Sequence, residues 1–227
     1  APRHVLLYKA FGWEHPVFCH LPVILAPGGG KLSKRKGAAS VGDYREKGYL
    51  PEALFNFLAL LGWSPGDDRE KMTLPELIEA FSLERIMPKS AAFDETKLEW
   101  LNGQYLIDTP AEKLHDEVAR FLELRGYGPD MAAKPEMLAR HVSLLKDRSK
   151  RIDEIADTGL YFWRDPDSYD EKAVAKYWKP ETKERMAKLL PKLGTVEWNH
   201  SSLEALYRLE TEEQGIKFAD LIHPTRL

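Results

Sequence analysis

The residues best suited to chemistry lie in one short stretch, where three glycines precede four cations within six positions. Gly28, Gly29 and Gly30 lead into Lys31-Leu32-Ser33-Lys34-Arg35-Lys36, and Gly37 follows. Glycine has no Cβ, so the first three residues can form a hinge through backbone angles that other residues rarely adopt. Ammonium groups and a hydroxyl on such a loop suit a polyanion such as the triphosphate of ATP, whose charge shifts during phosphoryl or nucleotidyl transfer.

A solvated surface loop is the alternative interpretation of this stretch, and composition alone favours it. A Walker phosphate loop is excluded. That motif needs a glycine five positions before the Gly-Lys pair and a serine or threonine after the lysine. Leu25 and Leu32 occupy those two positions here.

The pattern Lys-x-Ser-Lys at residues 31–34 nevertheless resembles the Lys-Met-Ser-Lys-Ser loop of class I aminoacyl-tRNA synthetases. It has the Lys-Leu-Ser-Lys-Arg form of the glutamyl-tRNA synthetases, in which Leu32 replaces methionine and anchors the loop by packing, and Arg35 replaces the final serine. The resemblance to bacterial glutamyl enzymes is specific over residues 4–106 and looser from there to the end; it rests on residues 4–13, 44–63, 81–86 and 93–106.

The resemblance implies that the parent enzyme activates glutamate with ATP, accompanied by Mg²⁺, and transfers the glutamyl group to the 3′ end of tRNA(Glu). The implied partners are therefore glutamate, ATP and tRNA(Glu). In this reaction Lys34 would stabilise negative charge on the α-phosphate and the leaving pyrophosphate, Lys31 would assist, and Ser33 would donate a hydrogen bond. No general base is needed, because the substrate carboxylate is already a nucleophile.

The chain contains no His-x-Gly-His-like motif, which a class I synthetase carries early in its nucleotide-binding fold. Its seven histidines include no His-x-x-His pair, so we expect no zinc or other protein-bound metal site. We therefore expect a C-terminal part of a synthetase that begins just before the basic loop and ends several helices short. By itself it should not form glutamyl-adenylate.

Composition is that of a globular protein without an extreme charge. The 227 residues include 33 basic and 36 acidic side chains, a net charge of −3, so RNA contacts must come from local basic patches. A single cysteine, Cys19, excludes an internal disulfide and should be a small buried hydrophobe. No apolar run is long enough to span a membrane, and we expect a cytoplasmic monomer.

The hydrophobic pattern predicts a mainly α-helical chain in three parts. Residues 1–39 should form the end of a Rossmann-type catalytic domain, with a strand over residues 17–25 that Pro22 confines to an edge. Residues 40–108 should form a small helical connecting domain, and residues 109–227 an all-helical anticodon-binding cage. Missing strand patterns after residue 110 favour the glutamyl type, because glutaminyl enzymes carry β-barrels there.

Helix ends are indicated by capping signals. Ser40 with Asp43, Thr73 with Glu76, Thr109 with Glu112, and Ser201 with Glu204 read as capping pairs. Asp94 should cap a helix that stops before Gly103, and the helix over residues 50–61 is apolar almost all round, which predicts that it is the core of its domain. The C-terminal half should hold helices at residues 110–125, 135–146, 150–158, 170–178, 181–191 and 201–213.

A second group of cations lies in residues 140–151. On a continuous helix Arg148 would fall within the apolar arc of Leu144 and Ile152, so it needs a partner or a helix break, which Ser149 could supply as a cap. By resemblance Arg148 matches a position used in anticodon reading, and Lys146 and Arg151 are further candidates. Arginine suits this task because it can form two hydrogen bonds to a base edge or stack on a base.

Two alternatives to a synthetase part remain open at this stage. One is an RNA-binding module without catalysis, and the other is a helical interaction scaffold whose basic loop is incidental. Tyr161-Phe162-Trp163-Arg164 illustrates the ambiguity, because three aromatic residues can stack on RNA bases or simply fill a helical core. tRNA binding with a steep salt dependence would separate an RNA-binding protein from a scaffold.

Overall fold

The computed structural model describes residues 1–32 and 40–226, and over these ranges it consists of helices joined by turns, without a β-strand. The predicted mainly α-helical class is therefore confirmed. Contacts between residues divide the chain into two compact units, Ala1–Arg164 and Asp165–Leu227. The three-part division made from the sequence stays a prediction.

The N-terminal segment differs most from expectation. Helix α1 spans Pro2–Ala10, but the strand predicted over residues 17–25 does not form. Of residues 17–25, only Leu25 forms β-bridges, and these are isolated ones to Lys31 and Ala92. An apolar run becomes a strand only when a neighbouring strand accepts its hydrogen bonds, and no such partner lies along this segment. The described N-terminal residues thus hold no remnant of a sheet, and Cys19 is exposed rather than buried.

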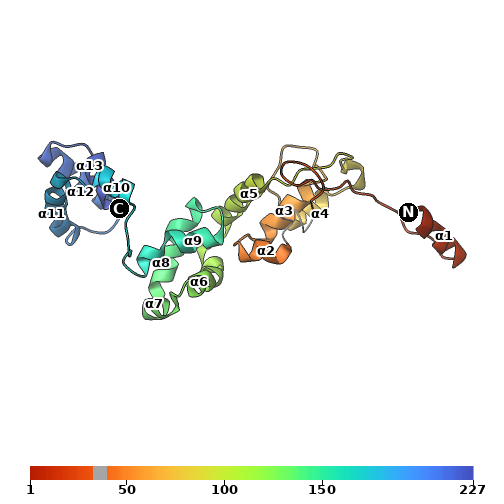
Figure 1. The fold of residues 1–227 in the computed structure, drawn as a ribbon, viewed down its shortest axis with the longest axis horizontal. Helices are drawn as coiled ribbons and strands as arrows, with labels where there is room; N and C mark the ends of the chain where they lie inside the picture. The colour runs from red at the N-terminus through yellow and green to blue at the C-terminus, as the bar shows by residue number, and fades with distance from the viewer. Residues whose placement is uncertain (33–39, 227) are drawn as a thin grey trace. The chain divides into compact units, whose positions relative to one another are not determined.

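The helices that follow are α2, α3, α4 and α5, with one short 3₁₀ turn between the last two (Figure 1): Val41–Glu46, Pro51–Leu60, Leu74–Ala80, Leu83–Arg85 and Glu95–Asp108. Three predicted caps are confirmed, because Ser40, Thr73 and Asp94 each accept a hydrogen bond from the backbone three residues on. Helix α3 is less buried than predicted, since Phe55 and Leu58 are exposed.

Helix α5 runs through Gly103 instead of stopping before it. A Cβ built at Gly103 would lie 3.6 Å from both the Ser149 carbonyl oxygen and the Lys150 Cα. The glycine therefore marks the point at which α5 contacts a distant segment of the chain. From the sequence alone, a glycine at this position resembles a helix end.

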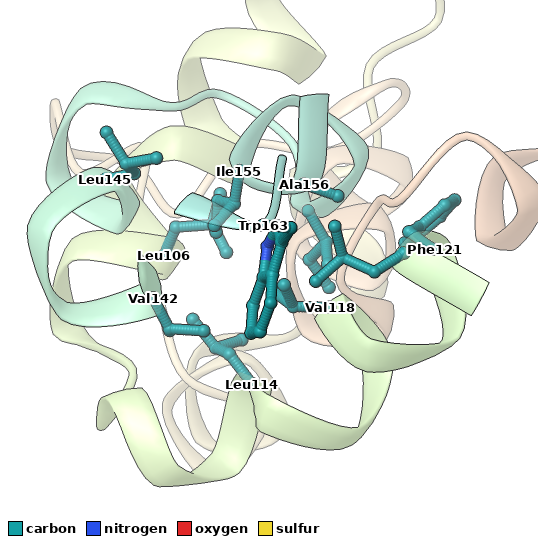
Figure 2. Packing of buried hydrophobic residues seen from close by; sticks show 11 residues of the cluster. Leu106, Leu114, Val118, Phe121, Val142, Leu145, Ile155, Ala156 and Trp163 are labelled. Carbon is teal, nitrogen blue, oxygen red and sulfur yellow. The ribbon is translucent and has the colours of Figure 1, made fainter. Parts of the chain in front are cut away.

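The second half of this unit comprises α6, α7, α8 and α9 with three short 3₁₀ turns: Ala111–Leu114, His115–Leu124, Gly128–Ala133, Pro135–Leu145, Lys146–Arg148, Ile152–Thr158 and Leu160–Phe162. Helix α7 lies in the gap between the helices predicted over residues 110–125 and 135–146. The capping pair at Thr109 is wrong, because its hydroxyl donates back to the Tyr105 carbonyl at 2.7 Å. Figure 2 shows the buried core, in which Trp163 packs among Val118, Val142 and Ile155.

The smaller unit contains α10, α11, α12 and α13: Glu171–Tyr177, Pro180–Leu193, His200–Gln214 and Ala219–Thr225. Asn199, not Ser201, caps α12 by accepting a hydrogen bond from the Ser202 backbone at 2.8 Å. Its core contains Leu189, Tyr207 and Leu221. Across the described part of the chain, no helix has the length and apolarity needed to cross a membrane.

Candidate functional site

The glycine-rich stretch forms a tight turn. Gly28, Gly29 and Gly30 have φ angles of 83°, 94° and 80°, in the region that favours glycine. The Ala26 amide donates to the Gly30 carbonyl at 2.9 Å, which closes the turn. A Cβ at Gly28 or Gly29 would meet nothing within 4 Å, so glycine is needed here for its backbone angles rather than for space.

This turn is tied to the segment that leads into α5. The Leu25 amide donates to the Ala91 carbonyl, and the Phe93 amide donates to the Leu25 carbonyl, both at 2.9 Å. Leu32 packs against the buried cluster that contains Phe93, so the packing predicted for this leucine is confirmed. Lys31 is exposed at the end of the turn. Ser33 and Lys34, the other candidate ATP contacts, lie outside the described residues.

The second candidate region is the link between α8 and α9, residues 146–151, hereafter the α8–α9 link. The helix break expected here is present: a 3₁₀ turn ends at Arg148, Ser149 is extended, and α9 begins at Ile152. Ser149 does not cap α9, because its hydroxyl donates to the Leu145 carbonyl at 2.9 Å. Arg148 is exposed and, among the described residues, makes no hydrogen bond or ion pair.

Lys146 is held by backbone carbonyls. Its Nζ donates to the Ile107 carbonyl at 2.7 Å and to the Leu106 carbonyl at 3.4 Å, and it also contacts Asp147. The last carbonyls of a helix have no partner within the helix, so this ammonium group satisfies the C-terminus of α5. Its side chain is only 15% exposed. Lys146 therefore faces the protein, although its place in the basic group of residues 140–151 had made it a candidate RNA contact.

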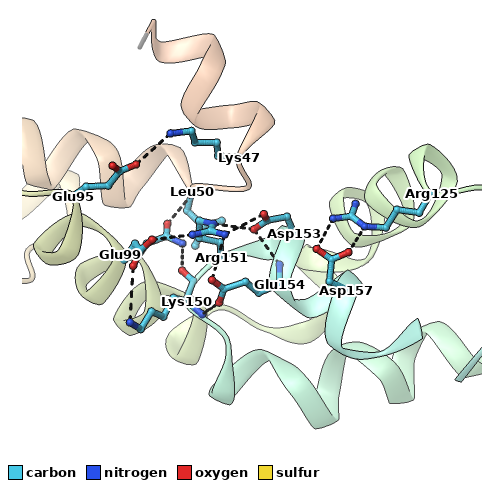
Figure 3. A network of polar contacts seen from close by, with 11 residues as sticks. Lys47, Leu50, Glu95, Glu99, Arg125, Lys150, Arg151, Asp153, Glu154 and Asp157 are labelled. Carbon is cyan, nitrogen blue, oxygen red and sulfur yellow. Dashed lines mark hydrogen bonds and ion pairs between the residues drawn. The ribbon is translucent and has the colours of Figure 1, made fainter. Parts of the chain in front are cut away.

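Arg151 also points inward (Figure 3). Its guanidinium lies 2.8 Å from a Glu99 carboxylate oxygen and 3.0 Å from Asp153 Oδ1. Burial by itself would lower the pKa of Arg151, but the hydrogen bonds and charge of Asp153 and the charge of Glu154 outweigh it and raise that pKa. Burial, reinforced by the charge of Glu99, raises the pKa of the neighbouring Tyr49 to about 12. Both groups therefore keep their usual protonation states near neutral pH.

Asn102 is the residue that sequence reasoning missed. Its side chain is fully buried in α5; Oδ1 accepts from the Leu50 amide at 2.8 Å, and Nδ2 donates to the Lys150 carbonyl at 2.5 Å. One amide thus bridges two segments far from each other in sequence. The only hint was an asparagine between Leu101 and Gly103 inside a predicted helix. Loss of such a buried group costs about 1–3 kcal/mol for each partner left unsatisfied.

Gly48 also contacts the segment that follows the α8–α9 link. Its carbonyl accepts from the Ile152 amide at 3.0 Å, and its φ is 80°. A Cβ at this position would lie 2.7 Å from the backbone nitrogen of Asp153, which is closer than real contacts allow. No local sequence pattern indicates this role, because the close contact of Gly48 is with residues about a hundred positions away.

The aromatic run at 161–163 is divided between core and surface. Trp163 is buried and donates from Nε1 to His141 Nδ1 at 3.0 Å, while His141 Nε2 lies 2.6 Å from the Ile155 carbonyl. Phe162 stacks on the His141 ring, and only Tyr161 is well exposed. Most of the run is therefore structural. Among the described residues no group of histidine, cysteine and acidic side chains is placed to hold a metal ion.

Comparison with known proteins gives two family matches that together cover most of the chain. Residues 1–100 match the catalytic domain of class I tRNA synthetases (E and Q), and residues 112–227 match an anticodon-binding domain. A glutamate–tRNA ligase from Moorella thermoacetica is 41% identical over 230 residues, and one from Desulforudis audaxviator is 39% identical over 232. Both alignments include the whole chain, which spans 47% and 46% of those proteins.

Solved structures agree with the sequence matches. A crystal structure of a glutamate tRNA ligase from Elizabethkingia meningosepticum, in complex with its amino acid, aligns with 99% of this chain at a TM-score of 0.81 and 33% identity. Glutamate-tRNA synthetase from Elizabethkingia anophelis aligns with a TM-score of 0.75 and 31% identity. The chain covers 48% and 47% of these two structures. The chain therefore belongs to the family of class I tRNA synthetases for glutamate and glutamine, and it carries their anticodon-binding domain.

Proposed function

We propose that this protein charges tRNA(Glu) with glutamate, and that the chain supplies the ATP-phosphate loop and the tRNA-binding helices of that enzyme. The observation that carries the proposal is the pair of family matches, which join a catalytic-domain sequence to an anticodon-binding sequence in one chain. The names of the aligned relatives, all glutamate–tRNA ligases, support glutamate as the amino acid.

In this proposal the basic loop stabilises charge during adenylate formation. The glutamate carboxylate attacks the α-phosphorus of ATP, and pyrophosphate leaves. Lys34 offsets the negative charge that builds on the phosphates, with help from Lys31, and Ser33 donates a hydrogen bond. Mg²⁺ arrives with the ATP phosphates, as is usual for nucleotide substrates. The turn at Gly28–Gly30 serves as the hinge of this loop.

The anticodon end of tRNA is assigned to the region around the α8–α9 link. Among its candidate cations Arg148 is exposed and unpaired within the described chain, while Lys146 and Arg151 are engaged by protein groups. An unpaired guanidinium can form two hydrogen bonds to the edge of an unstacked anticodon base. We expect the protein to act as a monomer in the cytoplasm.

An RNA-binding module without catalysis is the second candidate for these 227 residues taken alone. It is favoured by the absence of a His-x-Gly-His-like motif from the sequence. Two assays on the purified chain test both proposals. Binding of a tRNA(Glu) transcript, titrated over a range of salt, should weaken steeply as salt rises. ATP–pyrophosphate exchange with glutamate should stay at background for this chain.

Each assay has an outcome that would contradict one part of these proposals. Binding of tRNA(Glu) no tighter than that of an unrelated RNA of equal length would contradict the assigned role of the helices. Clear glutamate-dependent exchange would instead contradict the view that these residues need further parts of a synthetase for adenylate formation.

A further inference from the structure

The α8–α9 link is tied to α5 on both sides of Arg148. Two positions before it, the Lys146 ammonium group caps the carbonyls of Ile107 and Leu106. Two positions after it, the Lys150 carbonyl accepts the Asn102 amide at 2.5 Å. One position further, Arg151 pairs with Glu99 at 2.8 Å. The link thus has its fixed points on either side of a single exposed arginine.

The same fixed points leave the link little room to move. Asn102 is fully buried, so its two hydrogen bonds do not compete with water. Its amide can satisfy both partners in one orientation only, because Leu50 offers an N–H and Lys150 offers a carbonyl. Glu99 and Asp153 hold the Arg151 guanidinium from two sides, and Figure 3 shows them converging on it. Backbone and side-chain contacts therefore fix the same few residues.

Arg148 contrasts with its neighbours. Its backbone sits at the end of a 3₁₀ turn whose next residues are clamped, yet its side chain is exposed and makes no polar contact among the described residues. A side chain that must meet a base edge gains selectivity when its backbone is held to within a fraction of an ångström. Arg148 has this arrangement, because its guanidinium is free within the described chain and its backbone is held in place.

We propose that Asn102 and Arg151 are positioning residues for anticodon recognition: through the α8–α9 link they fix where Arg148 presents its guanidinium. The proposal rests on the base-reading role assigned to Arg148 above and extends it to two residues that do not touch RNA. Arg151, a candidate RNA contact in the sequence analysis, acts through Glu99 and the link backbone in this account. Asn102 acts through the Lys150 carbonyl.

The experiment measures discrimination, defined as the ratio of two dissociation constants. One is for a tRNA(Glu) transcript with a single anticodon base exchanged, and the other is for the unchanged transcript. Both are measured by fluorescence anisotropy at one salt concentration. The temperature is well below the unfolding midpoint of the least stable variant. The variants are Asn102→Ala, the milder Glu99→Gln, Arg148→Ala, and the double variants that combine Arg148→Ala with each of the first two.

Tyr105→Phe is the matched control. It removes a partly buried hydroxyl from the same helix, but that hydroxyl lies within hydrogen-bonding distance of the Met72 carbonyl and Asn56 Oδ1, neither of which belongs to the α8–α9 link. It should lower the thermal midpoint and leave discrimination unchanged. The positioning variants should lower discrimination by at least about fivefold, the lower bound for losing one base contact. In the Arg148→Ala background they should lower it no further.

Three results would overturn the proposal. Discrimination could be lost in Arg148→Ala and kept in both positioning variants, or it could fall equally in Tyr105→Phe, or the losses could add in the double variants. The first would mean that Arg148 needs no support from the link, and the other two would mean general destabilisation. If Arg148→Ala itself leaves discrimination unchanged, the base contact assigned under the proposed function is wrong, and the positioning role falls with it.

Discussion

Arg151 and Glu99 form an ion pair of 2.8 Å that joins the α8–α9 link to α5, across 52 positions of sequence. The arginine belongs to the basic run that suggested RNA contact, but its charge is met by protein carboxylates. The pair is only about one-quarter exposed, so water screens it less than a surface pair. Its consequence is structural: it fixes the helices that flank Arg148.

Gly48→Ala should destabilise the protein by about 2 kcal/mol or more. The substitution places a Cβ at a φ of 80°, which costs about 1–2 kcal/mol, and adds a clash with the Asp153 backbone. Urea unfolding followed by circular dichroism measures the change. Gly62→Ala is the control, because a Cβ there meets nothing within 4 Å and its φ is not positive. Equal stability of the two variants would show that the backbone around Gly48 and Asp153 can shift to accommodate the added Cβ.

His141 should make the protein less stable as the pH falls below about 6.5, which is the ordinary pKa of a histidine side chain. Burial lowers the pKa of His141 in the folded state, and the Ile155 hydrogen bond offsets this only in part. Between the folded and unfolded pKa values the unfolded chain binds more protons, so stability present above pH 6.5 is lost on acidification. Protonated Nδ1 could no longer accept from Trp163.

The unfolding midpoint measured between pH 7 and pH 5 tests this prediction. His141→Gln should flatten the decline while lowering stability at pH 7. His4→Gln, which removes an exposed histidine, should leave the profile unchanged. A decline of the same size in all three proteins would assign the pH dependence to other groups.

Lys34→Ala in a full-length enzyme of this sequence should lower kcat for adenylate formation by about 100- to 1000-fold with little change in the KM for glutamate. The reason is that a preorganised ammonium group acts mainly on charge in the transition state. Lys36→Ala, two residues away in the same loop, should have a much smaller effect. Steady-state pyrophosphate exchange measures both. Equal losses would make Lys34 one charge in a diffuse patch.

Several local signals were read correctly from the sequence, although the caps expected at Thr109 and Ser201 were not. The caps at Ser40, Thr73 and Asp94 depend on a side chain and a backbone amide three residues apart, so the sequence alone contains both partners. The break after Arg148 also followed from a cation within an apolar arc. The anchoring role of Leu32 came from family resemblance instead.

Features that depend on distant partners were not predictable. Asn102 bridges Leu50 and Lys150, and Lys146 caps α5 from about 40 positions away, so no local pattern announces either contact. The strand expected over residues 17–25 does not form for the same reason. An apolar run predicts that a segment is buried, but it does not show which strand would pair with that segment. Sequence therefore put Arg148 first among the candidate cations, and the fold added that Lys146 and Arg151 are engaged by protein groups.

The most direct test of the account is the affinity of the chain and of Arg148→Ala for tRNA(Glu) with its own and with an exchanged anticodon base. The account predicts that Arg148→Ala weakens binding of the unchanged tRNA by about 1–3 kcal/mol and relaxes discrimination at one position. Lys150→Ala, which removes a neighbouring exposed cation, should weaken binding of both tRNAs equally and lower the salt slope by about one. Tight binding that ignores both Arg148 and the anticodon would contradict the account.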